Sequence, residues 1–161
     1  MRSLIVAILA AAAAASGASP PRDSAAAKVV FVCAHGNVKS LIASEWLRRV
    51  AAERGLAVES VARGIDPENP VPAAIAEHLR GDGIDVSSYV ARGLAPVDAA
   101  GAARLVLIGV EPPAWVAGRG LSVDRWDGIP PASERYAASR DAMRARIETL
   151  LGELKPPKAT R

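Results

Sequence analysis

The residues best suited to chemistry lie around the chain's single cysteine, Cys33. Lys39 follows it after five intervening residues, among which Gly36 and Asn37 favour a tight loop because both residue types tolerate turn conformations. Backbone N–H groups of such a loop bind anions, and their field, together with a nearby cation, favours the thiolate form of a cysteine. The pattern therefore predicts an anion-binding loop with a nucleophile beneath the anion.

Each residue of this loop has an expected role. We expect Cys33 to be the nucleophile and Lys39 to hold the anion, while the Ser40 hydroxyl caps the next helix or hydrogen-bonds the thiolate. His35 is interpreted as a turn residue or a neighbour of the thiolate in preference to a catalytic base. The expected anion-binding residues are Ala34, His35, Gly36, Asn37, Val38, Lys39 and Ser40. The alternative is that Cys33 is a small buried apolar side chain and Lys39 a solvated lysine at a helix start.

The segments around the loop alternate between strand and helix patterns. Strands are predicted at 28–32, 57–62, 104–110 and 121–126. Helices are predicted from 40 to 54, around Ile75 and Leu79, and from about 133 to 154. This alternation predicts a three-layer α/β fold, with an open, mostly parallel sheet of about four strands and helices on both faces. Ligands of such a sheet bind at the carboxyl ends of its strands, where Cys33 is expected.

The first predicted helix has two faces of different character. Its apolar face carries Leu41, Ile42, Trp46, Leu47 and Val50. Its polar face carries Ser44, Glu45, Arg48, Arg49 and Glu53. We expect the apolar face to pack on the sheet and the polar face to contact solvent.

The start of the chain has the pattern of an export signal. Arg2 precedes the apolar run at 4–15, and the small residues Ser16 and Ala18 precede two prolines, which predicts cleavage after Ala18. The run is shorter than the roughly 20 apolar residues of a permanent membrane span. We therefore expect an exported protein, periplasmic or secreted, without a permanent membrane anchor; the alternative is an uncleaved, alanine-rich leader. The predicted organisation is a signal peptide at 1–18, a disordered linker at 19–27, one domain at 28–154 and a flexible tail at 155–161.

The sequence around Cys33 is similar to that of a known family. VVFVCAHGNVKSLIASEWL, at 29–47, resembles the phosphate loop of the low-molecular-weight protein tyrosine phosphatase superfamily, which also contains thioredoxin-coupled arsenate reductases. The similarity continues through GDGIDVSSYVARGL at 81–94 and RLVLIGVEPP at 104–113, and ends in VDRWDGIPPASERYAASRDAM at 123–143. The resemblance implies a cysteine-dependent phosphatase that acts on phosphate monoesters through a cysteinyl-phosphate intermediate, with protein phosphotyrosine as one candidate substrate. Together with the leader pattern, it predicts an exported phosphatase.

Two of this chain's departures from the family pattern concern residues expected to take part in catalysis. Lys39 stands where the family has arginine, so a mobile point charge replaces a planar fork that can hold two phosphoryl oxygens. Ile129, Pro130 and Pro131 stand where the family has its Asp-Pro general acid. Asp127 is then the expected general acid, and Asp124 is the second candidate.

Two other functions compete with the phosphatase. The first is a non-catalytic module of the same fold that binds phosphate or another oxyanion. The second, less expected, is an arsenate reductase, whose internal disulfide relay needs further cysteines that this chain lacks.

Composition limits the possible partners. The net charge is +3, but the basic residues are scattered singly, so we expect no nucleic-acid binding, which needs clustered cations. One cysteine excludes both an internal disulfide and a zinc site of several thiolates. The expected ligand is a phosphate ester or another oxyanion. The sequence implies no cofactor or metal and does not predict an oligomeric state.

Overall fold

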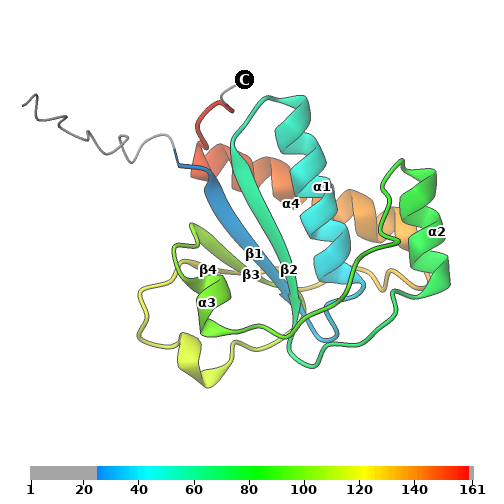
Figure 1. Cartoon of the computed structure of the whole chain (residues 1–161), viewed down its shortest axis with the longest axis horizontal. Coiled ribbons are helices and arrows are strands. Elements are labelled where there is room, and N and C mark those ends of the chain that lie inside the picture. Colours follow the sequence, from blue (N-terminus) through cyan, green and yellow to red (C-terminus); the bar gives the residue numbers. More distant parts are fainter. Residues whose placement is uncertain (1–24, 160–161) are drawn as a thin grey trace, which may run out of the picture.

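Four parallel strands form the centre of the molecule. In the computed structural model, which describes residues 25–159, the strands are β1 (Ala27–Cys33), β2 (Val58–Gly64), β3 (Arg104–Leu107) and β4 (Val123–Arg125). They form one sheet in the order β2-β1-β3-β4, and every neighbouring pair is parallel (Figure 1). The predicted α/β fold with an open parallel sheet of four strands is confirmed. The expected signal peptide at 1–18, and the expected linker up to residue 24, lie outside the described residues.

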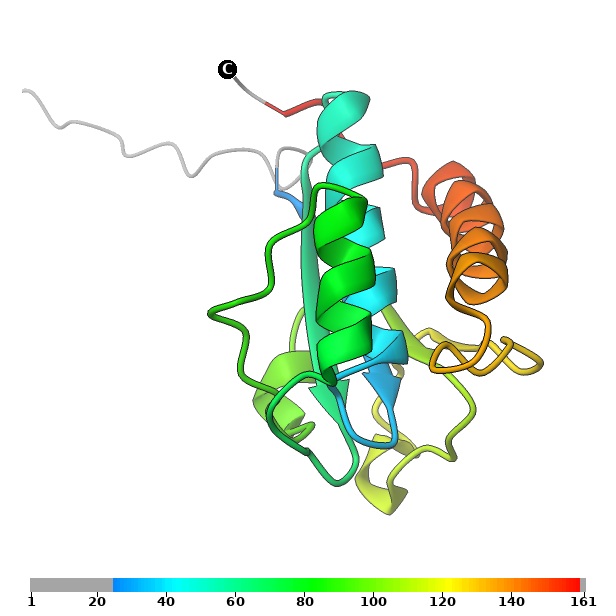
Figure 2. The same cartoon turned by 90° about the vertical axis from the view of Figure 1, so that its right-hand side faces the viewer.

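The two faces of the sheet have separate hydrophobic cores. Along β1, Val29 and Phe31 point into one core, whereas Val30 and Val32 point into the other, as the alternation of a strand requires. The first core is covered by the helices α1 (Lys39–Glu53), α2 (Ala73–Gly81) and α4 (Tyr136–Leu154) (Figures 1 and 2). The second core is covered by the short helix α3 (Pro96–Ala99), the 3-10 helix at Ala114–Val116 and their connecting loops. The long helices thus share one face, and only short helical segments cover the other.

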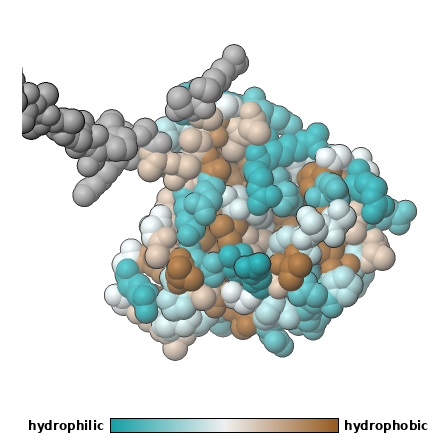
Figure 3. Space-filling view, in the orientation of Figure 1, coloured by the Kyte–Doolittle hydropathy of each residue, from teal (hydrophilic) through white to brown (hydrophobic). Residues whose placement is uncertain are grey.

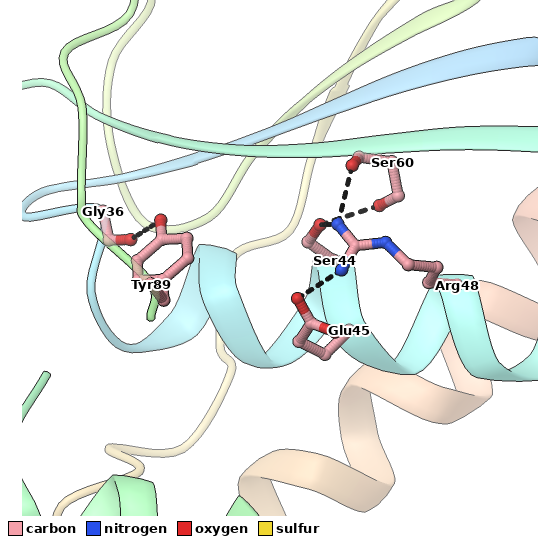
Figure 4. Close-up of polar contacts among 6 residues, drawn as sticks. All are labelled: Gly36, Ser44, Glu45, Arg48, Ser60 and Tyr89. Atoms are coloured by element: carbon pink, nitrogen blue, oxygen red, sulfur yellow. Dashed lines mark hydrogen bonds and ion pairs between the residues drawn. The ribbon is translucent and has the colours of Figure 1, made fainter. Parts of the chain in front are cut away.

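Helix α1 packs as predicted on its apolar side but also buries a polar residue. All five residues of the predicted apolar face are buried. Ser44, expected on the solvent side, is fully buried and accepts a hydrogen bond from the Ser60 hydroxyl on β2 at 2.9 Å (Figure 4). Arg48 covers this pair by donating to the Ser60 carbonyl at 3.0 Å and to Ser44 Oγ at 3.4 Å. The long arginine side chain, held also by Glu45, therefore replaces water over this part of the helix.

The segment after α4 returns to the amino end of β2. Leu56 and Lys158 form an antiparallel bridge, in which Ala57 N–H donates to the Pro157 carbonyl at 2.7 Å and Ala159 N–H donates to the Gly55 carbonyl at 2.8 Å. Residues 157–159, which belong to the predicted flexible tail, therefore find backbone partners beside the start of β2.

The surface mixes polar and apolar residues. Figure 3 shows the two kinds interspersed over the face seen in Figure 1. Within residues 25–159, no helix has both the length and the apolar character needed to cross a membrane.

Replacing Ile147 by alanine tests the packing of α4 on the first core. Ile147 is fully buried, so its truncation leaves a cavity, and we expect Ile147→Ala to lower the free energy of unfolding by about 2–5 kcal/mol in urea titrations. Val97 is 73% exposed, so Val97→Ala is the matched control, with an expected change within about 0.5 kcal/mol. Equal effects of the two substitutions would contradict this packing.

Candidate active site

Cys33 lies where the order of the sheet creates a crevice. The chain leaves β1 on one side and β3 on the other, so the carboxyl ends of these two strands border a topological switch point, a common ligand site in such sheets. A cavity of about 240 Å³ occupies this position. Its lining residues are Cys33, Ala34, His35, Asn37, Val38, Lys39, Ile108, Gly109, Pro131, Ala132 and Ser133.

The thiol of Cys33 is buried and surrounded by hydrogen-bonding groups. Gly36 N–H donates to Cys33 Sγ at 3.3 Å, and the Ser40 hydroxyl lies 3.1 Å from the same sulfur. Helix α1 begins immediately beyond the loop, has no side-chain cap and carries no acidic residue in its first turn. Its first N–H groups therefore lack intrahelical partners, and the helix dipole favours a negative charge beside them. The arrangement suits an oxyanion held directly above a thiolate.

The carbonyl groups of the loop are held away from the cavity. Ile65, Asp66 and Glu68 donate their N–H groups to the carbonyl oxygens of residues 33, 34 and 35, at 3.0, 2.9 and 3.0 Å respectively. A trans peptide points its C=O and the following N–H in opposite directions. Anchoring these carbonyls on the 65–68 segment therefore turns the N–H groups of residues 34, 35 and 36 towards the other side, and the Gly36 N–H accordingly reaches the sulfur.

Two glycines permit the loop to approach β2 this closely. Gly36 has a φ of 72°, and a Cβ on it would lie 2.7 Å from Gly64 N. A Cβ on Gly64 would lie 2.7 Å from the carbonyl carbon of His35. The sequence predicts the role of Gly36, whereas that of Gly64 depends on a contact between distant segments.

Lys39 connects the loop to the segment after β4. Its Nζ donates to the Ile129 carbonyl at 3.2 Å, at the edge of the cavity that residues 131–133 also line. An ammonium group has three donors, so this bond leaves two N–H groups for an oxyanion. Lys39 therefore lies with Cys33 at the same cavity, as expected for the residue in the arginine position.

The other polar loop residues brace the loop. The buried Asn37 side chain donates to the Pro70 carbonyl at 3.3 Å. His35 Nδ1 lies 3.2 Å from the Asp66 carbonyl oxygen and 3.3 Å from Glu68 Oε1, so its ring is directed towards the 66–68 segment. A further support that sequence reasoning missed is Tyr89, whose hydroxyl donates to the Gly36 carbonyl at 2.6 Å (Figure 4).

Neither predicted general acid lies at the cavity. Asp127 is exposed, its carboxylate lies 3.4 Å from Arg125 Nε, and Gly128, with a φ of 73°, turns the chain between it and the cavity-lining segment. Asp124 pairs with Arg104, at the amino end of β3, at 2.8 Å. Within residues 25–159 no carboxylate lines the cavity. The structure therefore does not bring Asp127 or Asp124, the two expected general acids, to the cavity that holds Cys33.

No metal ligand set accompanies the thiol. In the described part of the chain, no three His, Cys, Asp or Glu side chains are placed so that they could hold a metal ion together.

Comparisons with known proteins identify a sequence family and several structures of similar fold. Residues 28–108 match the family model described as low molecular weight phosphotyrosine protein phosphatase. No curated protein sequence matches the chain.

Three solved structures illustrate the likeness in fold. YfkJ from Bacillus subtilis gives a TM-score of 0.70 at 20% identity, over 81% of this chain and 96% of that one. A low molecular weight protein tyrosine phosphatase from T. tengcongensis gives 0.60 at 20% identity, over 80% and 99%. A thioredoxin-dependent arsenate reductase from Corynebacterium glutamicum gives 0.64 at 21% identity, over 82% of this chain and 63% of that one, so this chain spans less than two thirds of that protein. These likenesses concern the fold.

Replacing Gly64 by alanine tests the close contact beneath the loop. The added Cβ would lie 2.7 and 2.8 Å from backbone atoms of His35 and Gly36, so the loop must move. We expect Gly64→Ala to weaken the protection that inorganic phosphate gives Cys33 against alkylation, by about tenfold or more in phosphate concentration. Gly152→Ala is the matched control, because a Cβ on this glycine of α4 meets no atom within 4 Å. If phosphate protects Cys33 equally in both variants, the contact does not set the loop geometry.

Proposed function

Because the chain belongs to the low molecular weight phosphotyrosine protein phosphatase family, we propose that it hydrolyses phosphate monoesters through a cysteinyl-phosphate intermediate on Cys33. The observation that carries this proposal is the position of the Cys33 sulfur. It lies at the carboxyl end of β1, within hydrogen-bonding distance of Gly36 N–H and the Ser40 hydroxyl, and next to the uncapped start of a 15-residue helix. These groups place hydrogen-bond donors where the negative charge of the transition state develops.

The first half of the reaction transfers the phosphoryl group to the enzyme. The Cys33 thiolate attacks phosphorus, the sulfur–phosphorus bond forms, and the bond to the leaving oxygen breaks with its electron pair. Loop N–H groups and the Lys39 ammonium hold the three remaining phosphoryl oxygens. Ser40 donates to the sulfur and stabilises it as the leaving group of the second half, in which water attacks phosphorus and releases inorganic phosphate and the thiolate.

The character of the cavity favours esters with a good leaving group. With no carboxylate lining it in residues 25–159, the leaving oxygen takes its proton from solvent, which serves an activated aryl ester better than an alkyl ester. Ile108 and Ala132, apolar residues of the lining, offer contacts to the carbon part of the substrate. Among the described residues, no Phe, Tyr or Trp lines the cavity to stack on a phenyl ring, so protein phosphotyrosine is one candidate among phosphate monoesters.

The lack of a carboxylate at the cavity, within residues 25–159, supports a second candidate function. A protein that keeps the oxyanion loop but lacks a proton donor at the cavity can bind phosphate without efficient turnover. Turnover of an activated aryl phosphate separates the two functions, because a binding module releases no product. Arsenate reduction is less favoured, since one cysteine cannot form an internal disulfide and the reaction would need a thiol from another molecule.

Hydrolysis of an aryl phosphate under reducing conditions tests the phosphatase function. We expect the protein to release phosphate from 4-nitrophenyl phosphate, Cys33→Ser to abolish the release, and Lys39→Ala to reduce it by about a hundredfold to a thousandfold. Lys39→Arg should retain activity because it keeps the charge. Asp127→Asn is the control and should match the parent, since Asp127 faces Arg125. Activity that survives in Cys33→Ser would contradict the mechanism, and loss of activity in Asp127→Asn would return that residue to the role of acid.

We also propose that the protein is exported, on the basis of the pattern at 1–18. When the full chain is expressed in a Gram-negative host, cell fractionation and mass spectrometry should find a periplasmic protein that begins at Ser19. Ile8→Arg interrupts the apolar run, so this variant should keep its leader and remain in the cytoplasm. A parent protein that retains residues 1–18 in the cytoplasm would contradict export.

A further inference from the structure

The Gly36–Asn37 peptide is held differently from the three peptides before it. The carbonyls of residues 33, 34 and 35 accept backbone N–H groups from the 65–68 segment. The carbonyl of Gly36 instead accepts the hydroxyl of Tyr89, at 2.6 Å and from a residue 53 positions away (Figure 4). The Tyr89 side chain therefore holds the fourth carbonyl, as backbone N–H groups of the 65–68 segment hold the first three.

We propose that Tyr89 is a positioning residue of the phosphatase reaction, which fixes the Asn37 N–H as a donor to the bound oxyanion. The geometry gives the reason. Because the peptide is planar and trans, a carbonyl held by Tyr89 on the outer side directs the Asn37 N–H towards the opposite side, where the cavity lies. This inference rests on the proposed function and adds to it a residue outside the Cys33–Ser40 loop.

This peptide needs such support more than its neighbours do. Gly36 has a φ of 72°, and a glycine restricts the rotation of its adjoining peptides less than any other residue. Without a partner for the Gly36 carbonyl, the peptide can turn and present its oxygen to the cavity, which repels an anion. The Tyr89 hydroxyl therefore holds the Gly36–Asn37 peptide in one of its two orientations. Because the peptide is already ordered, anion binding does not have to supply the free energy that orders it.

Tyr89 is itself held firmly enough to act in this way. Its N–H donates to the Val86 carbonyl at 3.0 Å. Two residues later, Ala91 exchanges two hydrogen bonds with the Asn69 side chain, at 2.8 and 3.2 Å. Gly64 then pairs with the 92–94 segment. The chain that follows Tyr89 and the loop after Cys33 therefore both pack on Gly64.

The Tyr89 hydroxyl also keeps its proton near neutral pH. Burial, and next to it the charge of the nearby Cys33 thiolate, raise the pKa of Tyr89 to about 12. Tyr89 is therefore protonated near neutral pH, and its hydroxyl remains a donor to the Gly36 carbonyl.

The experiment compares Tyr89→Phe with Tyr136→Phe. Both substitutions keep the ring and remove a hydroxyl that makes one short hydrogen bond, since Tyr136 donates to Asp82 Oδ2 at 2.7 Å in a part of the molecule that does not line the cavity. Inorganic phosphate is the probe, and its protection of Cys33 against alkylation is titrated in both variants and in the parent. We expect Tyr89→Phe to need about tenfold more phosphate for half protection, and Tyr136→Phe to match the parent.

Four further readouts distinguish positioning from a general loss of stability. Alkylation of Cys33 without phosphate should be unchanged in Tyr89→Phe, because the Gly36 N–H that contacts the sulfur belongs to the preceding peptide. For 4-nitrophenyl phosphate, kcat should fall by about tenfold, and urea midpoints should fall no further than in Tyr136→Phe. In amide NMR spectra of the parent, the Asn37 resonance should shift on addition of phosphate, a readout that needs no variant.

The outcomes are separable. Half protection at the same phosphate concentration in Tyr89→Phe and the parent, an equal loss in Tyr136→Phe, or an Asn37 resonance that phosphate does not move would each overturn the positioning role. A parent protein that binds phosphate but releases no product overturns the phosphatase function. Weaker phosphate binding in Tyr89→Phe would then still support the role of Tyr89 in holding the anion.

Discussion

The site depends on the outward direction of four successive carbonyl groups, those of residues 33 to 36. Three are bound by backbone N–H groups of the 65–68 segment and the fourth by Tyr89. Each bound carbonyl turns the next N–H the other way, so the loop offers donors on its inner side, where one of them already reaches the Cys33 sulfur. The order of the sheet places the partners of this loop, because β1 lies between β2 and β3. Strand β2 positions the 65–68 segment, and the end of β3 borders the cavity.

Electrostatics and sterics reinforce this geometry at the same point. The uncapped start of α1 has no acidic residue in its first turn, so no carboxylate of that turn competes for its N–H groups. Lys39 stands beside them, and at the edge of the cavity its ammonium group donates to the carbonyl of residue 129. Gly36 packs so closely on Gly64 that a side chain on either residue would push the loop away from β2. We therefore expect anion binding to depend on this contact.

Patterns that are local in sequence predict much of this molecule. The apolar runs and helical periodicities place the four strands and the three long helices, and the spacing from Cys33 to Lys39 identifies the loop, because each signal spans only a few neighbouring residues. What the sequence does not predict depends on contacts between distant segments. Tyr89 reaches Gly36 across 53 positions, Ser44 is buried by Ser60 and Arg48, and Asp127 turns away from the cavity at Gly128 towards Arg125. The burial or direction of each side chain is set by its partner, and no periodicity reveals that partner.

Trapping the intermediate tests most directly whether this loop makes Cys33 a nucleophile towards phosphorus. The reduced protein is mixed with an activated aryl phosphate, quenched within the first turnovers under conditions that preserve a phosphorus–sulfur bond, digested, and analysed by mass spectrometry. The result expected is one phosphoryl group on the peptide that contains Cys33, absent when phosphate release is complete. Release of the aryl product with no phosphorylated protein, or a phosphoryl group on any other residue, would contradict the cysteinyl-phosphate mechanism.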